Sequence, residues 1–187
     1  MTRPRGISLL FACATFVWTF ASLGCGGGGG SSCPAKNAPD VSGTWMVDNT
    51  TIDPVHTDCP SELNSPLLDE IEGSSFGVTQ NVGSVTLDDH KGDVLKGCVA
   101  DSGDVSGSAH QSGSEQGCNV SVNVSLSGNF NSSPTNTTFR FVIHGSGACS
   151  LSCTLTLDSR FTRMNTGVVA AAVAPSGGAY VDRILGR

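Results

Sequence analysis

The chain has 187 residues, of which 16 are acidic and 10 basic, and its formal net charge is −6 at pH 7. This length suits a single domain with a buried core. The acidic balance disfavours nucleic acid as a partner, because neutralising phosphates requires Lys and Arg.

The first 24 residues have the three parts of a secretory signal peptide. Arg3 and Arg5 form a short basic region, residues 7–23 are almost wholly apolar, and small residues precede Cys25. The apolar run is close to the lower limit for spanning a bilayer, and residues 26–30 after it carry no charge. The sequence therefore predicts that residues 1–24 are removed on export.

Residues 21–25, Ala-Ser-Leu-Gly-Cys, resemble the lipobox of bacterial lipoproteins. Gly24 and Cys25 match the family pattern, whereas Ser22 stands where the family usually has Leu. The resemblance implies that Cys25 carries a diacylglycerol lipid and anchors the protein to a membrane. Gly26 at the next position implies the outer membrane of a Gram-negative bacterium. Ser22 and Gly24 also fit ordinary signal cleavage, which would cut the same bond.

The number of cysteines bears on whether Cys25 carries a lipid. Cys13 leaves with the signal peptide, and if Cys25 carries lipid, six cysteines remain; if Cys25 is free, seven remain and one is stranded. An exported domain is oxidised, so we expect the six to pair. Fifteen pairings are possible. We expect Cys149–Cys153 across a tight turn, and, from proximity in the sequence, Cys98–Cys118 and Cys33–Cys59.

Residues 25–40, rich in Gly and Ser, are typical of a flexible tether. Residues 41–164 alternate between apolar and polar side chains, which predicts antiparallel strands with one wet face. Short strands joined by turns favour an all-β, up-and-down barrel of about eight strands, with a β-sandwich as the alternative. We expect strands at 43–49, 76–80, 84–88, 94–100, 104–109, 119–126, 139–143 and 151–158.

Two segments differ from this pattern. Ser65 as an N-cap, Pro66 at the first helical position and Gly73 as a stop predict a short helix over 65–73, placed to cover a barrel mouth. Residues 165–187 contain an apolar run too short to span a membrane, and we expect a strap or a disordered tail there.

Gly43-Thr44-Trp45 resembles the opening Gly-x-Trp of lipocalins. The resemblance implies an eight-stranded barrel in which Trp45 closes one end, and a lumen able to hold a small apolar ligand or lipid. The same residues packed tightly would make an ordinary core, in a structural or interaction module of the cell envelope, and we favour this second hypothesis. The residues expected to line the lumen are Trp45, Val47, Phe76, Val122, Val124, Phe139, Phe141 and Leu155.

Enzymatic chemistry has little support. The sequence has no Gly-x-Ser-x-Gly, no His-Glu-x-x-His and no phosphate-binding loop. Asp53, His56, Asp58 and Cys59 lie close together, but they lack the ligand spacing of a zinc site, and Cys59 is expected in a disulfide. We therefore predict no catalytic residue, metal or cofactor.

Overall fold

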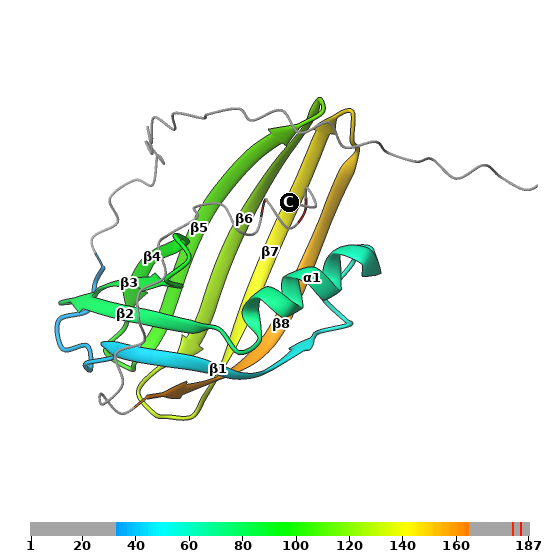
Figure 1. The fold of residues 1–187 in the computed structure, drawn as a ribbon. Coiled ribbons are helices and arrows are strands. Elements are labelled where there is room, and N and C mark those ends of the chain that lie inside the picture. The colour runs from blue at the N-terminus through cyan, green and yellow to red at the C-terminus, as the bar shows by residue number, and fades with distance from the viewer. Residues whose placement is uncertain (1–32, 165–180, 182–183, 185–187) are drawn as a thin grey trace, which may run out of the picture.

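The computed structural model describes residues 33–164, 181 and 184, which form a closed barrel of eight strands and one helix (Figure 1). Each strand is antiparallel to its neighbours, and β8 returns to pair with β1. The barrel predicted from the alternation is confirmed, and it forms in preference to the sandwich. The strands are β1 (Gly43–Ile52), β2 (Ser75–Asn81), β3 (Ser84–Asp88), β4 (Val94–Val99), β5 (Asp104–Glu115), β6 (Cys118–Asn129), β7 (Thr135–Gly147) and β8 (Leu151–Arg163).

The alternation of β6 shows why these sequences form strands. Val120, Val122, Val124 and Leu126 are 3% exposed or less, and the polar residues between them face outward. A strand places successive side chains on opposite faces, so this order puts one apolar row inside the barrel and one polar row in water.

Seven of the eight strands fall into two length classes, and β1, with 10 residues, lies between them. β2, β3 and β4 have five to seven residues, whereas β5 to β8 have 12 or 13. Pairing of β4 with β5 stops at Lys96 and Ser108, and pairing of β1 with β8 stops at Ile52 and Leu157. The long strands therefore extend past the closed barrel as a four-stranded sheet (Figure 1). We call this extension the overhang; it comprises residues 109–115, 118–124, 141–147 and 151–156.

Helix α1 spans Ser61–Ile71, so it begins four residues before the predicted 65–73 and ends two residues before. Pro60 takes the N-cap position, and Leu63 N–H donates to the Pro60 carbonyl at 3.0 Å. Pro66 removes only the hydrogen bond to the carbonyl of Glu62 in the exposed first turn, so the helix continues through it. Glu72 N–H donates to the Leu68 carbonyl at 2.8 Å, and Gly73 turns the chain with φ 72°.

Residues 33–40, part of the predicted tether, lie against the barrel. Cys33 is bonded to Cys98, and Ala35 is 7% exposed. The N–H groups of Lys36 and Asn37 donate to Asp101 Oδ1 at 3.0 and 2.8 Å. Residues 25–32 of that tether, which include Cys25, lie outside the described residues, as does the predicted signal peptide.

The chain returns to the barrel near its C-terminus. Val181 and Ile184 have helical backbone; Val181 is 2% exposed and belongs to the main apolar cluster, and Ile184 packs against it. The rest of 165–187 lies outside the described residues, so the strap or tail there stays a prediction. Within the described part of the chain, no helix has the length and apolar character needed to cross a membrane.

Candidate functional site

The residues predicted to line the lumen all point into one interior. Each of the eight is 1% exposed or less, and all belong to a single apolar cluster. All eight side chains are buried, four of them within the closed barrel and four on the inner face of the overhang, and their role in holding a ligand stays a prediction. The eight residues are Trp45, Val47, Phe76, Val122, Val124, Phe139, Phe141 and Leu155.

Aromatic rings occupy the centre of this interior. The Phe161 ring lies 5.6 Å from that of Phe76, 5.7 Å from Phe130 and 5.8 Å from Phe139, measured between centroids. Phe130 in turn meets Trp45 edge-on at 4.8 Å. These are contact distances for aromatic pairs, so the rings pack against one another across the barrel.

Trp45 lies at one end of the cluster with its polar group satisfied. Its Nε1–H donates to the Val41 carbonyl at 3.0 Å. The guanidinium of Arg163 lies 5.9 Å from the centre of the indole ring, within cation–π range. Arg163 also donates to the Asp40 and Ser42 carbonyls, which ties the segment before β1 to the end of β8.

The inner face of the overhang is apolar and covered. Val120, Val122 and Ile143 are 3% exposed or less, in one cluster with Leu67 and Ile71 of α1 and with Val181. Polar side chains interrupt this face on β5, where Gln111 and Glu115 occupy inner positions. Gln111, opposite Val122, has its Oε1 buried without a hydrogen-bond partner among the described residues. The sequence gives no sign of this, because a lone Gln in a Ser-rich strand resembles any surface residue.

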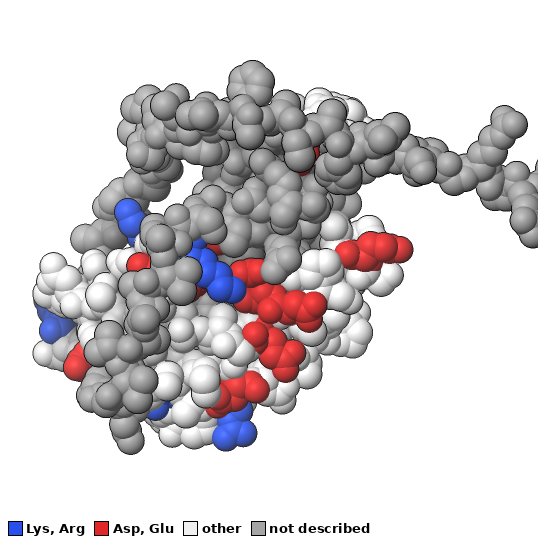
Figure 2. All heavy atoms as spheres, viewed as in Figure 1, with Lys and Arg blue, Asp and Glu red and all other residues white. Residues whose placement is uncertain are grey.

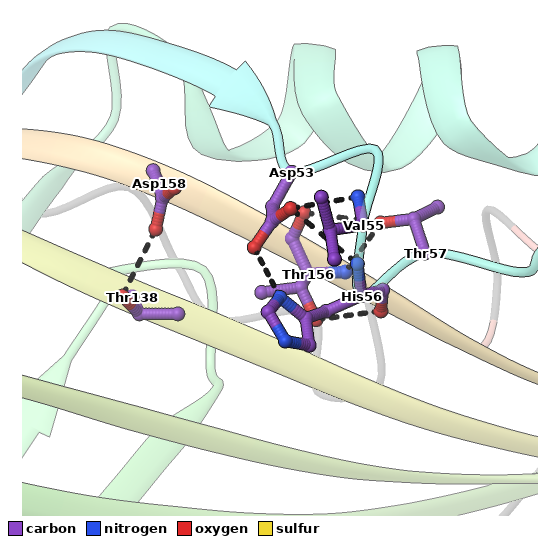
Figure 3. A network of polar contacts seen from close by, with 7 residues as sticks. All are labelled: Asp53, Val55, His56, Thr57, Thr138, Thr156 and Asp158. Carbon is purple, nitrogen blue, oxygen red and sulfur yellow. Dashed lines mark hydrogen bonds and ion pairs between the residues drawn. The ribbon is translucent and has the colours of Figure 1, made fainter.

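The free edge of β8 in the overhang is closed by the loop of residues 53–58 (Figure 3). Asp53 N–H donates to the Thr156 carbonyl and Asp58 N–H to the Thr154 carbonyl, both at 2.9 Å. Thr156 N–H donates to Thr57 Oγ1 at 3.1 Å. The loop thus takes over as the neighbour of β8 where β1 stops.

Within this loop Asp53 and His56 form an exposed pair (Figure 3). Asp53 Oδ2 and His56 Nδ1 are 2.6 Å apart, and Val55 N–H donates to Asp53 Oδ1 at 2.8 Å. The hydrogen bond from His56, followed by that from Val55, lowers the pKa of Asp53 below 3.8. Cys59, the fourth residue weighed for a metal, is bonded to Cys153. The described residues contain no group of three or more His, Cys, Asp or Glu side chains that could hold a metal ion.

Replacing His56 by alanine is expected to raise the pKa of Asp53 towards 3.8, because the largest cause of its depression is removed. A depressed carboxyl pKa favours the folded loop above the unfolded pKa, and this contribution is lost as the pH falls through the folded pKa. Carboxyl carbon NMR titration measures the midpoint. Asp104, whose pKa is lowered by hydrogen bonds from Ser102 and Asn129, is the internal control and should not move. An unchanged Asp53 midpoint would contradict the assignment.

All six cysteines expected to pair do so, but with a different connectivity. The bonds are Cys33–Cys98, Cys59–Cys153 and Cys118–Cys149. The predicted pairs Cys149–Cys153, Cys98–Cys118 and Cys33–Cys59 were wrong. They followed proximity in the sequence, whereas the barrel brings together residues 31 to 94 positions apart.

The remaining histidines are separate from one another in their contacts. His110 Nδ1 lies 2.9 Å from Asn123 Oδ1, and His144 Nδ1 lies 3.2 Å from Ser152 Oγ, both on the polar outer face of the long sheet. The ring of His90 lies over Gly77 in another part of the barrel.

No known protein family, no curated protein and no solved structure matches this chain. The likeness to lipocalins therefore rests on Gly43, Trp45 and the eight-stranded barrel.

Proposed function

We propose that this protein is a lipid-anchored cell-envelope protein whose barrel is a non-enzymatic interaction module that binds partners through its outer surface. One observation supports the proposal: aromatic side chains of the protein pack against one another inside the barrel, with Phe161 in ring contact with Phe76, Phe130 and Phe139. A binding lumen normally combines an apolar wall with several placed polar groups. Here the buried hydroxyls of Thr50 and Ser159 are paired with each other at 3.1 Å. Gln111 Oε1 is buried without a hydrogen-bond partner among the described residues.

The charge of the surface supports anchoring by lipid. Figure 2 shows acidic side chains along α1, where Glu62 and Asp69 are exposed and Glu72 follows directly. Glu70 beside them is buried, with Oε1 2.5 Å from Lys91 Nζ. Such a face is repelled by anionic headgroups, so electrostatic attraction cannot hold the domain at a membrane through this side. A diacylated Cys25 would supply stable attachment, because two acyl chains together suffice.

Replacing Cys25 by serine is expected to move the protein from the membrane fraction to the soluble fraction of the cell envelope, with loss of the lipid mass. Fractionation and intact mass of the mature protein measure both effects. Replacing Cys33 by serine is the matched control; Cys33 is the next cysteine along the chain and forms a disulfide, so this variant should keep its lipid. A wild-type protein whose mature form has an unmodified Cys25 would contradict the anchor.

A separate experiment tests whether the barrel binds a small molecule in its interior. Native mass spectrometry of the full chain, released gently from detergent, should show the protein mass with no co-purifying small molecule. A lipid or other apolar molecule bound at a fixed one-to-one ratio would contradict a filled interior and would favour ligand binding in the lumen.

A further inference from the structure

Within residues 33–164, the outer edge of β5 has no paired strand in the overhang. β4 pairs with β5 only as far as Ser108, so among the described residues the segment 109–115 pairs with β6 alone. Figure 1 shows the upper half of β5 at the margin of the sheet. The opposite margin, on β8, is covered by residues 53–58 through main-chain hydrogen bonds. Among the described residues, one edge of the same sheet is therefore covered and the other pairs with no further strand.

The sequence of this edge does nothing to prevent pairing. Proteins usually protect exposed strand edges with Lys, Pro, bulges or very short strands. Residues 109–115, Ala-His-Gln-Ser-Gly-Ser-Glu, contain no Lys, Arg or Pro, and with His taken as neutral Glu115 at the end is the one formally charged residue. All seven residues pair with β6 in continuous register, without a bulge. This edge is long, regular and almost uncharged, which suits the addition of another strand.

We propose that two copies of this protein pair through residues 109–115 of β5, antiparallel, around a two-fold axis at Ser112. The inference rests on the proposed function, because it names the partner and the surface that the interaction module uses. In this register Ser112 faces Ser112 of the second copy, and His110 faces Ser114 on the polar side. On the inner side Gln111 faces Gly113. No two like charges oppose each other, so the segment is complementary to itself.

The length of the segment fits this arrangement. Antiparallel pairing about Ser112 sets Glu115 of the second copy opposite Ala109. The next residue, Gln116, begins the two-residue turn between β5 and β6, so the added strand ends there. That position faces Ser108, where β4 takes up its pairing with β5. Residues 109–115 of one copy thus pair with residues 109–115 of the other, and β4 keeps its place in both copies.

Gln111 supplies a second, independent observation. Its Oε1 is buried and has no hydrogen-bond partner among the described residues, which is costly for an amide group. About the proposed axis the two Gln111 side chains are diagonal neighbours on the same face, a separation of about 7–8 Å that long side chains can bridge. Gly113 lies opposite each Gln111 and has no side chain, so it leaves room for the amide groups. The two amides can then donate to each other's oxygens, which satisfies the buried acceptor.

Pairing of one short strand buries a small area, so the dimer is weak in dilute solution. Confinement of the anchored protein to a membrane raises the effective concentration of the second copy, and a weak contact then suffices. The experiment must therefore cover high protein concentrations.

The test is disulfide trapping of the full chain, purified in detergent micelles, over a wide range of concentration. In Ser112→Cys the new thiols meet at the axis, and most of the protein should form a covalent dimer under mild oxidation. The matched control is Ser121→Cys, because Ser121 pairs with Ser112 from β6 and faces the same side. Its thiol would lie about 14 Å from its counterpart, three strand spacings away, beyond disulfide reach. Peptide mass mapping should locate the new bond at the substituted position.

A second pair of variants tests the unmodified contact. Ser112→Lys sets two ammonium groups face to face at the axis and should abolish the dimer seen by light scattering at high concentration, whereas Ser121→Lys should retain it. Absence of trapping by Ser112→Cys at the highest concentration would overturn the proposal. So would a dimer that survives Ser112→Lys, or a different protein found bound along this edge. None of these outcomes affects the fractionation of the Cys25 variant, so failure of the dimer and failure of the anchored module are distinguishable.

Discussion

Removing the Cys59–Cys153 disulfide by the double substitution Cys59→Ala and Cys153→Ala is expected to lower the free energy of unfolding more than removing the Cys118–Cys149 bond. This bond joins residues 94 positions apart. Chain entropy predicts a stabilisation of about 4.7 kcal/mol for a closed loop of that length, and about 3.7 kcal/mol for the 31 positions between Cys118 and Cys149. The sulfur atoms also lie in the core, because Cys59 is 8% and Cys153 5% exposed.

The structure gives this bond a second task. It ties the start of α1 to β8, beside the loop of residues 53–58 that closes the β8 edge. Losing it should therefore loosen that loop before the barrel unfolds. Chemical unfolding of the wild type, of this double variant and of the Cys118→Ala and Cys149→Ala double variant measures stability, and hydrogen exchange at Thr154 and Thr156 reports on the loop. The prediction is wrong if the Cys118→Ala and Cys149→Ala variant is the less stable of the two, or if exchange at β8 is unchanged.

Strands with a regular apolar row could be predicted from the sequence. For strands whose inner face contains polar residues, the predicted range was shorter than the observed strand. β5 was expected to end at Ala109 because its later inner positions, Gln111, Gly113 and Glu115, give no apolar period. The structure continues to Glu115, because β6 beside it supplies a complete ladder of partners. A neighbouring strand can thus hold a sequence extended where its own pattern does not demand it.

A buried hydroxyl group likewise made the predicted range of β8 too short. The apolar row Leu155, Leu157 is interrupted by Ser159 before Phe161, and the predicted strand stopped at 158. In the structure Ser159 is 4% exposed and its Oγ lies 3.1 Å from Thr50 Oγ1 of β1, so the polar group is satisfied inside the barrel. Phe161, at the centre of the ring contacts, was missed for this reason.

Disulfide pairing and the open edge of β5 belong to a different class of feature. Both depend on which strands become neighbours when the barrel closes and on how long each strand is. No local pattern in the sequence carries that information, since parity predicts that six cysteines pair and leaves fifteen ways to do it. The six cysteines and the eight interior residues were predictable one by one, whereas the surface proposed here for dimerisation required the assembled sheet.

Replacing Gly97 by alanine is expected to lower the free energy of unfolding by more than about 3 kcal/mol, beyond the typical range for overpacking. Gly97 of β4 lies directly opposite Gly107 of β5. A Cβ added at Gly97 would lie 1.7 Å from the Ser106 carbonyl oxygen and 2.6 Å from the Gly107 Cα. Both are backbone atoms, so no change of rotamer relieves the overlap, and the two strands must separate.

The opposite glycine is the matched control. A Cβ at Gly107 would meet Leu87 Cδ1 at 3.4 Å and Leu95 Cβ at 3.6 Å, which are ordinary contacts, so Gly107→Ala should cost less than about 1 kcal/mol. The pairing of β4 with β5 extends only from Lys96 to Val99, as short as that of β1 with β2, so separation at Gly97 opens the barrel wall at a seam of four residue pairs. Denaturant unfolding of both full-length variants measures the difference. Equal stability of the two variants would show that this close approach of β4 and β5 does not hold the barrel closed.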